Sequence, residues 1–128
     1  MALILNDVVM EKSVILDPNG ISSSNIVDTM IVVNNEMFFR AMIEMYRDGN
    51  ASLIPLNEVS SEIQSARFRE HHHVYVINSV LELINPQDFL IDKDFIHEVE
   101  LMELESSSGT KPLKILVVRI FTKRYVGV

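Results

Sequence analysis

The sequence predicts an α+β fold, in which a mostly antiparallel sheet is packed by two helices and ends in a C-terminal β-hairpin. Charged residues recur at helical spacing over residues 36–47, a second amphipathic pattern covers residues 57–70, and two strand-like segments flank a Ser-rich loop near the C-terminus. The chain of 128 residues has the usual length of one domain. We find no internal repeat or linker in it, so residues 1–128 are predicted to form a single globular domain.

Composition narrows the setting and the class of partner. The apolar fraction of 48% is typical of a folded protein, and the net charge of -7 repels phosphate backbones and anionic membrane surfaces. The absence of cysteine removes thiol catalysis, thiolate zinc sites and disulfides. No apolar run approaches the length of a membrane span, so we expect a protein of the cytoplasm or of a virion, without a membrane partner.

The first third is predicted to contain two strands around a tight turn. Residues 8–16 and 25–33 are rich in Val, Ile and Leu, and Asp17-Pro18-Asn19-Gly20 lies between them. Proline presets the backbone angle φ, and glycine tolerates positive φ, so this tetrapeptide favours a turn.

The strongest helical pattern covers residues 36–47. Its charged residues recur at i, i+4, i+8 and i+11: Glu36, Arg40, Glu44 and Arg47. Large apolar side chains occupy the remaining faces: Phe38, Phe39, Met42, Ile43, Met45 and Tyr46. Asn34 or Asn35 is the expected cap at the start, and Gly49 is the expected stop. A helix apolar over most of its circumference needs cover on two sides. We therefore predict that residues 37–46 meet another subunit.

This helix also provides the predicted interface between subunits. Its residues are Phe38, Met42, Met45 and Tyr46. A symmetric homodimer is the simplest way to cover such a surface.

The middle of the chain is predicted to hold the second helix and a strand. Leu56, Val59 and Ile63 fall on one helical face over residues 57–70, although three serines weaken the propensity. Residues 72–77 are β-branched or aromatic and indicate a strand that continues toward residue 83. Asn85-Pro86 then has the composition of a short helix start.

The last third is predicted to form a hairpin, with arms at residues 97–105 and 113–125 and a loop at residues 106–112. Its expected cross-strand pairs are Glu105 with Lys114 and Glu100 with Arg119. The glutamates change face at residues 101–102, which suggests a β-bulge there. The apolar run around Val117 is typical of a strand covered on both faces.

A metal site is one functional hypothesis. A strand would direct His71 and His73 to the same side, and Asp94 or His97 could supply a further ligand for Zn²⁺ or Fe²⁺. The competing interpretation places these histidines at a polar surface junction, where they bind nothing. A third interpretation treats the cluster as a pH sensor.

A second hypothesis concerns the basic C-terminal strand. Arg119, Lys123 and Arg124 surround Phe121 and Tyr125, and rings beside positive charge hold single-stranded nucleic acid. The competing interpretation pairs these cations with the glutamates of the neighbouring strand and buries the rings.

The sequence contains no GxGxxG, P-loop, GxSxG or HExxH motif, and we predict neither catalytic residues nor a cofactor. The apolar surplus, which includes seven methionines, favours a non-enzymatic protein–protein interaction or assembly module, homo-oligomeric or bound to another protein. A component of viral or bacterial assembly, an adaptor and an inhibitor all fit this description. The alternatives are a metal-binding protein or metalloenzyme and a single-stranded nucleic-acid binder.

Overall fold

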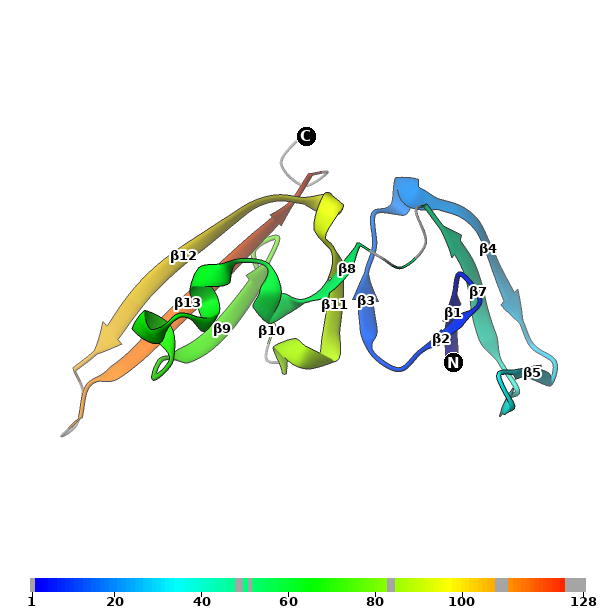
Figure 1. Cartoon of the computed structure of the whole chain (residues 1–128), viewed down its shortest axis with the longest axis horizontal. Helices are drawn as coiled ribbons and strands as arrows, with labels where there is room; N and C mark the ends of the chain where they lie inside the picture. The colour runs from blue at the N-terminus through cyan, green and yellow to red at the C-terminus, as the bar shows by residue number, and fades with distance from the viewer. Residues whose placement is uncertain (1, 48–49, 51, 83–84, 108–110, 124–128) are drawn as a thin grey trace.

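The computed structural model of the chain describes residues 2–47, 50, 52–82, 85–107 and 111–123. Over these residues the backbone is mostly β-strand, and the helical elements with defined bounds are 3-10 turns of three or four residues (Figure 1). The predicted α+β fold with two packing helices is therefore wrong. None of the helices with defined bounds is long and apolar enough to cross a membrane.

The elements follow one another in the order of their numbers within each type. The strands are β1 (Ala2–Leu5), β2 (Val8–Met10), β3 (Ser13–Ile15), β4 (Ile21–Val27), β5 (Ile31–Val33), β6 (Glu36–Phe38), β7 (Ala41–Tyr46), β8 (Leu53–Pro55), β9 (His72–Ile77), β10 (Val80–Glu82), β11 (Phe89–Asp92), β12 (Ile96–Ser106) and β13 (Leu113–Thr122). The 3-10 turns are η1 (Pro18–Gly20), η2 (Leu56–Glu58), η3 (Ser61–Gln64), η4 (Ala66–Phe68), η5 (Pro86–Asp88) and η6 (Lys93–Phe95).

The described strands form two four-stranded sheets joined by a smaller one. The order is β2-β1-β7-β4 in the first sheet and β10-β9-β13-β12 in the second. A three-stranded sheet, β3-β11-β8, lies between them, and β5 and β6 form a separate hairpin (Figure 1). Three of the pairings are parallel, namely β1 with β7, β3 with β11 and β9 with β13.

The two halves of the chain repeat one topology. Each half begins with a hairpin (β1–β2 or β9–β10), continues through a central strand (β3 or β11) and a 3-10 turn (η1 or η6), and enters a longer strand (β4 or β12). The returning strand (β7 or β13) pairs antiparallel with that longer strand and parallel with the first strand of its own half. The sequence showed no repeat because few residue identities accompany this shared topology.

Corresponding hydrogen bonds confirm the structural repeat. The Oδ1 atom of Asn6 accepts from the Tyr46 backbone N–H at 2.8 Å, and the Oδ1 atom of Asn78 accepts from the Thr122 N–H at 2.9 Å. Both asparagines open hairpin turns with positive φ, at 49° in each case. Asp17 caps η1 and Asp92 caps η6, each accepting from the backbone N–H two residues later. The same local chemistry is therefore used twice.

The helix predicted over residues 36–47 is a turn and two strands. Asn34 and Asn35 both have positive φ, at 51° and 66°, so they form the tight turn between β5 and β6 instead of capping a helix. β7 then lies between β1 and β4 and pairs with both. The charge spacing fitted a helix, but pairing on both edges satisfies the backbone of β7 as a central strand.

The helix predicted over residues 57–70 is the series of turns η2, η3 and η4. The Ser60 side chain caps η3 by accepting from the Glu62 N–H. η4 begins after Ser65 without a side-chain cap, so the segment is divided into separate turns. Its apolar residues Leu56, Ile63 and Phe68 nevertheless enter the main core, where they cover one face of the second sheet. Among the described residues, this core consists of Leu56, Ile63, Phe68, Tyr75, Ile77, Ile91, Leu116, Val118 and Ile120.

The C-terminal hairpin is present as β12 and β13. Its register aligns Glu105 with Lys114 and Glu100 with Arg119, as the sequence predicted. The bulge predicted at residues 101–102 is absent, because the irregularity lies between Ile96 and Glu98. A corresponding irregularity lies between Ile21 and Ser23 in the first half, so the bulge belongs to the repeated unit. The part of the predicted second arm beyond residue 123 lies outside the described residues.

Candidate functional site

The residues of the predicted metal site lie in separate parts of the second half. His71 Nε2 is 3.7 Å from Glu103 Oε1, whereas His73 Nε2 lies 2.9 Å from the backbone oxygen of Phe68. Asp94 and His97 are exposed near the start of β12. His73 is level with Leu116 on β13, and Ile96, next to His97, is level with Thr122, a separation of six residues or roughly 20 Å along a strand. No three such side chains in the described part of the chain could hold a metal ion.

The predicted interface residues occupy different environments on strands. Phe38 lies half-buried on β6, and Met42 lies half-buried on β7. Met45 is exposed, and Tyr46 is buried. The helical surface on which we grouped these four residues does not exist, so any interface must be sought among the exposed strand residues.

The basic C-terminal strand is partly neutralised. Arg119 Nη1 lies 3.4 Å from Glu100 Oε2 on the neighbouring strand, and its guanidinium group lies 5.3 Å from the centre of the Phe121 ring. Lys123 is exposed. Arg124 and Tyr125, which completed the predicted nucleic-acid patch, lie outside the described residues.

The most connected polar group of the described structure joins the two halves. The Tyr46 hydroxyl donates to Asp92 Oδ2 at 2.5 Å and accepts from the Asp17 backbone N–H at 2.9 Å. Arg47 Nη2 lies 3.4 Å from Asp92 and 3.1 Å from Asp17. The two equivalent capping aspartates of the repeat are thus tied to the same tyrosine and arginine. These four residues, Asp17, Tyr46, Arg47 and Asp92, are called the seam below.

This seam sets the ionisation of its members. Burial, followed by the hydrogen bond to Asp92, raises the pKa of Tyr46 to about 12. Burial alone disfavours the charged form of Asp92, but hydrogen bonds from Tyr46, Asp94 and Ser52 and the charge of Arg47 lower the pKa of this carboxyl group. Asp92 is consequently a fixed anion and Tyr46 a fixed neutral donor, an arrangement that suits a structural link.

Beside the seam, the two repeats place their large and small residues at opposite positions of the turn and the strand. Gly20 of η1 packs against Tyr46, and a Cβ atom at residue 20 would lie 2.7 Å from Tyr46 Cε1. In the second half the ring belongs to the turn, as Phe95, and the strand residue is the smaller Thr122. Each half therefore has one large and one small residue at this place.

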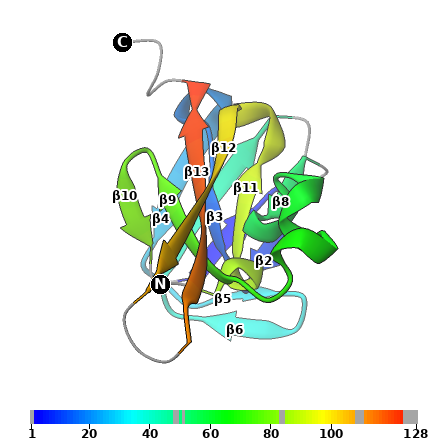
Figure 2. The ribbon, with the colours of Figure 1, turned by 90° about the vertical axis from the view of Figure 1, so that its left-hand side faces the viewer.

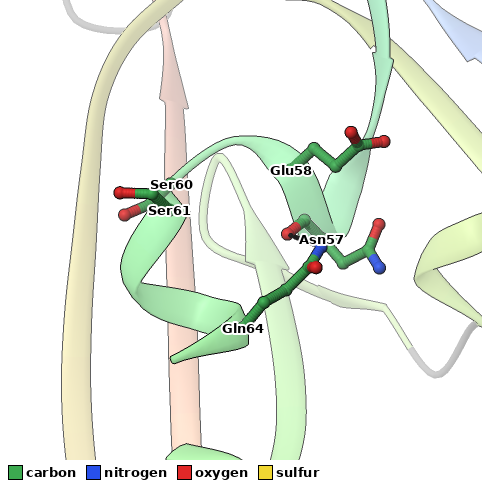
Figure 3. A pocket seen from close by; sticks show the side chains of 5 residues that line it. All are labelled: Asn57, Glu58, Ser60, Ser61 and Gln64. Atoms are coloured by element: carbon green, nitrogen blue, oxygen red, sulfur yellow. Dashed lines mark hydrogen bonds between the residues drawn. The ribbon is translucent and has the colours of Figure 1, made fainter. Parts of the chain in front are cut away.

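Two surface hollows among the described residues are lined mainly by polar side chains. One, of about 340 Å³, is lined by Asn57, Glu58, Ser60, Ser61 and Gln64 (Figure 3). In Figure 3 the Gln64 side chain points back toward Asn57, whose backbone oxygen accepts from Gln64 Nε2 at 3.1 Å. The other, of about 350 Å³, is lined by Arg67, His71, Glu103, Leu104, Glu105 and Lys114. In the first hollow, Gln64 is held by the turn itself, so a ligand would compete with an internal hydrogen bond.

The described surface carries a cluster of large apolar side chains on the β5–β6 hairpin. Val32 pairs with Met37 in this hairpin, and Met30 and Phe39 directly flank its two strands. The exposed fractions are 58% for Met30, 63% for Val32, 58% for Met37 and 72% for Phe39. These four residues are called the hairpin patch below. Sequence reasoning missed it because Met30 and Val32 were assigned to one strand, whereas Met37 and Phe39 were assigned to a helix.

The class that the fold defines is a β-rich protein built from two copies of a hairpin-strand-turn-strand unit. Comparison of the chain with family models, curated proteins and solved structures finds no match in any of the three.

Proposed function

We propose that this chain is a non-enzymatic assembly module that binds a second copy or another protein through the hairpin patch. The observation that carries this proposal is the exposure of four large apolar side chains on a single hairpin and at its two ends, namely Met30, Val32, Met37 and Phe39. Contiguous exposed apolar surface of this kind marks interaction sites in soluble proteins.

The size of the hydrophobic term supports binding. Fully burying a large apolar side chain contributes about 1.5–3 kcal/mol. Four side chains that are more than half exposed therefore contribute on the order of 4–8 kcal/mol before the entropic cost of association is subtracted. Methionine adds adaptability, because its flexible side chain follows irregular partner surfaces.

Position and charge describe the partner further. The hairpin lies at the end of the long axis opposite β12 and β13, so a partner can approach it without meeting the second sheet (Figure 1). The net charge of -7 favours a neutral or basic protein over an anionic polymer.

The test is a double variant, Val32→Thr/Met37→Gln, which makes the patch polar while keeping strand-compatible side chains. We expect weaker binding of a hydrophobic fluorescent dye and, if the partner is a second copy, a lower native mass at equal protein concentration. The melting temperature should change little, because both side chains are exposed.

The matched control is Val8→Thr/Val80→Thr. These valines are 47% and 57% exposed but lie apart, at corresponding positions of the two repeats. Equal dye binding and equal native mass for the hairpin variant and the wild type would overturn the proposal.

A further inference from the structure

The central residues of strand β13, from Ile115 to Val118, are apolar on both of its faces. Its inner residues Leu116, Val118 and Ile120 have 0% exposure in the main core. Its outer face carries Ile115 and Val117, where a strand with one face in water normally carries polar side chains. The inner side is covered by the turns η2, η3 and η4, whereas no described element is assigned to the outer side.

The strand register gathers apolar residues of three strands on that outer side. Leu104 of β12 lies opposite Ile115, and Met102 of β12 and Val74 of β9 lie on either side of Val117. Leu104 and Met102 are 47% and 40% exposed. These five residues are called the outer sheet patch. Figure 2, which views this end of the molecule, shows β12 and β13 in front, with no other element passing before them.

We propose that the outer sheet patch packs face to face against the same patch of a second copy, giving a two-fold symmetric dimer. This inference goes beyond the proposed function, because it names a second copy as the occupant of a surface separate from the hairpin patch. A two-fold contact brings identical apolar patches together, so each copy supplies the cover that the other lacks.

The charged residues of edge strand β12 favour a dimer contact through the outer sheet patch over one through the free edge of the sheet. β12 is an edge strand of eleven residues, and such a length of free edge invites pairing with another chain. It carries the glutamates Glu98, Glu100, Glu103 and Glu105. Antiparallel pairing of two β12 strands would set these like charges against one another, which destabilises cross-strand pairs. The five residues of the outer sheet patch are uncharged, so a contact between two such patches has no like-charge repulsion among them.

The area of the face is of the size that a stable dimer needs. From strand spacing and rise, the four strands have a flat area on the order of 450 Å². The accessible surface of a pleated face with side chains exceeds its flat projection. Covering this face in both copies therefore buries about 900 Å² or more in total, close to the roughly 1,000 Å² that a specific interface needs.

The experiment is native mass measurement over a range of protein concentration, by sedimentation velocity or light scattering. We expect the wild type to be a dimer, and the variant Met102→Lys/Leu104→Lys to dissociate at least about 100-fold more readily, since four buried ammonium groups would face one another. The control Val32→Lys/Met37→Lys places the same charges on the hairpin patch and should leave the sheet dimer intact. Circular dichroism and melting temperature establish that each variant is folded.

A milder variant keeps the test decisive if the lysines impair folding. Val117→Thr is close in shape and favourable in strands, and it should raise the dissociation constant about 10-fold by placing two hydroxyl groups in the contact. A wild type that stays monomeric at millimolar concentration would overturn the inference, as would a dimer that survives the outer-patch variants. A monomer whose dye binding depends on the hairpin patch would overturn the dimer alone and leave the proposed function standing.

Discussion

At the residue scale, the two fully buried tyrosines of the described structure differ in what their hydroxyl groups contact. Tyr46 donates to Asp92 and accepts from Asp17, whereas the buried Tyr75 hydroxyl has no hydrogen-bond partner. An unpartnered buried hydroxyl costs free energy, while a hydroxyl bonded to a carboxylate stabilises the fold.

Replacing each tyrosine with phenylalanine should therefore change stability in opposite directions. Tyr46→Phe should lower the free energy of unfolding by about 2 kcal/mol, because it leaves Asp92 with one donor fewer. Tyr75→Phe should leave it unchanged or raise it by up to about 1 kcal/mol. Urea titration measures both. A loss at Tyr75 equal to that at Tyr46 would contradict the assigned contacts.

The same tyrosines predict how stability depends on alkaline pH. Burial raises both pKa values from 10.0 to about 12. A raised pKa means that the folded state keeps a proton which the unfolded state releases, so the stabilisation is present below pH 10 and is lost as pH rises toward 12. Each tyrosine should account for a loss on the order of 2 kcal/mol across this window.

The matched measurement uses Tyr75→Phe, which removes one of the two groups. Its unfolding free energy should fall about half as steeply as that of the wild type above pH 10. Parallel profiles for the two proteins would show that Tyr75 titrates normally in the folded state.

At this scale the sequence predicted the turn that begins at Asp17 and the short helix start at Asn85, but it was wrong about a cap at Asn34 or Asn35. Asp17 and Asn85 precede proline in turns, and the structure has both as caps that accept a backbone N–H two residues on. The seam could not be predicted, because Tyr46 and Asp92 meet only through the fold, 46 residues apart.

At the element scale, asparagine contributes to these turns in two ways: it tolerates positive φ, and its side chain can hydrogen-bond to a neighbouring strand. Asn78 accepts from the Thr122 N–H and donates to the Thr122 hydroxyl, each at 2.9 Å. Asn34 has a similar φ of 51° in the β5–β6 turn, and its exposed side chain has no hydrogen bond within the described residues. Comparing Asn34 with Asn78 therefore separates the cost of positive φ from the contribution of the hydrogen bonds to Thr122.

Alanine at these two turns should have unequal costs. Asn34→Ala should lower the unfolding free energy by about 1–2 kcal/mol, the cost of a non-glycine residue with positive φ. Asn78→Ala should cost about 3 kcal/mol, because it also loses two hydrogen bonds to β13. Chemical denaturation measures the difference. Equal costs would mean that the two hydrogen bonds between Asn78 and Thr122 contribute nothing to stability.

The element assignments show where sequence patterns decide and where they do not. The strand at residues 72–77 and the hairpin register at Glu100 and Arg119 depend on local composition and charge, and the structure has both. The segment at residues 36–47 had the charge spacing of a helix, but pairing of β7 with β1 on one edge and β4 on the other made its second part a strand.

At the scale of the whole molecule, the two halves share a topology but not a core. The main cluster of buried apolar residues belongs to the second half and its covering turns, with Ile91 from the central sheet. In the first half, Glu44 and Ser24 occupy the positions of Ile120 and Val99. The first half therefore gains less from apolar burial.

Hydrogen exchange should reveal this asymmetry. Amides of β9 and β13 should exchange only through global unfolding, whereas those of β4 and β7 should exchange through partial openings that cost less by about 1 kcal/mol or more. Native-state exchange with increasing denaturant distinguishes the two behaviours. Identical opening free energies in both halves would show that the seam at Tyr46 and Asp92 couples them fully.

The sequence by itself determined the acidic surface charge, the turn residues and the register of the C-terminal hairpin, because each depends on residues close together in the chain or directly across one turn. Only the tertiary structure decided the β-rich fold, the repeat, the seam and the two apolar patches. These features arise from parallel pairings and contacts between distant segments, where strand pairing outweighs the local preference of a residue run.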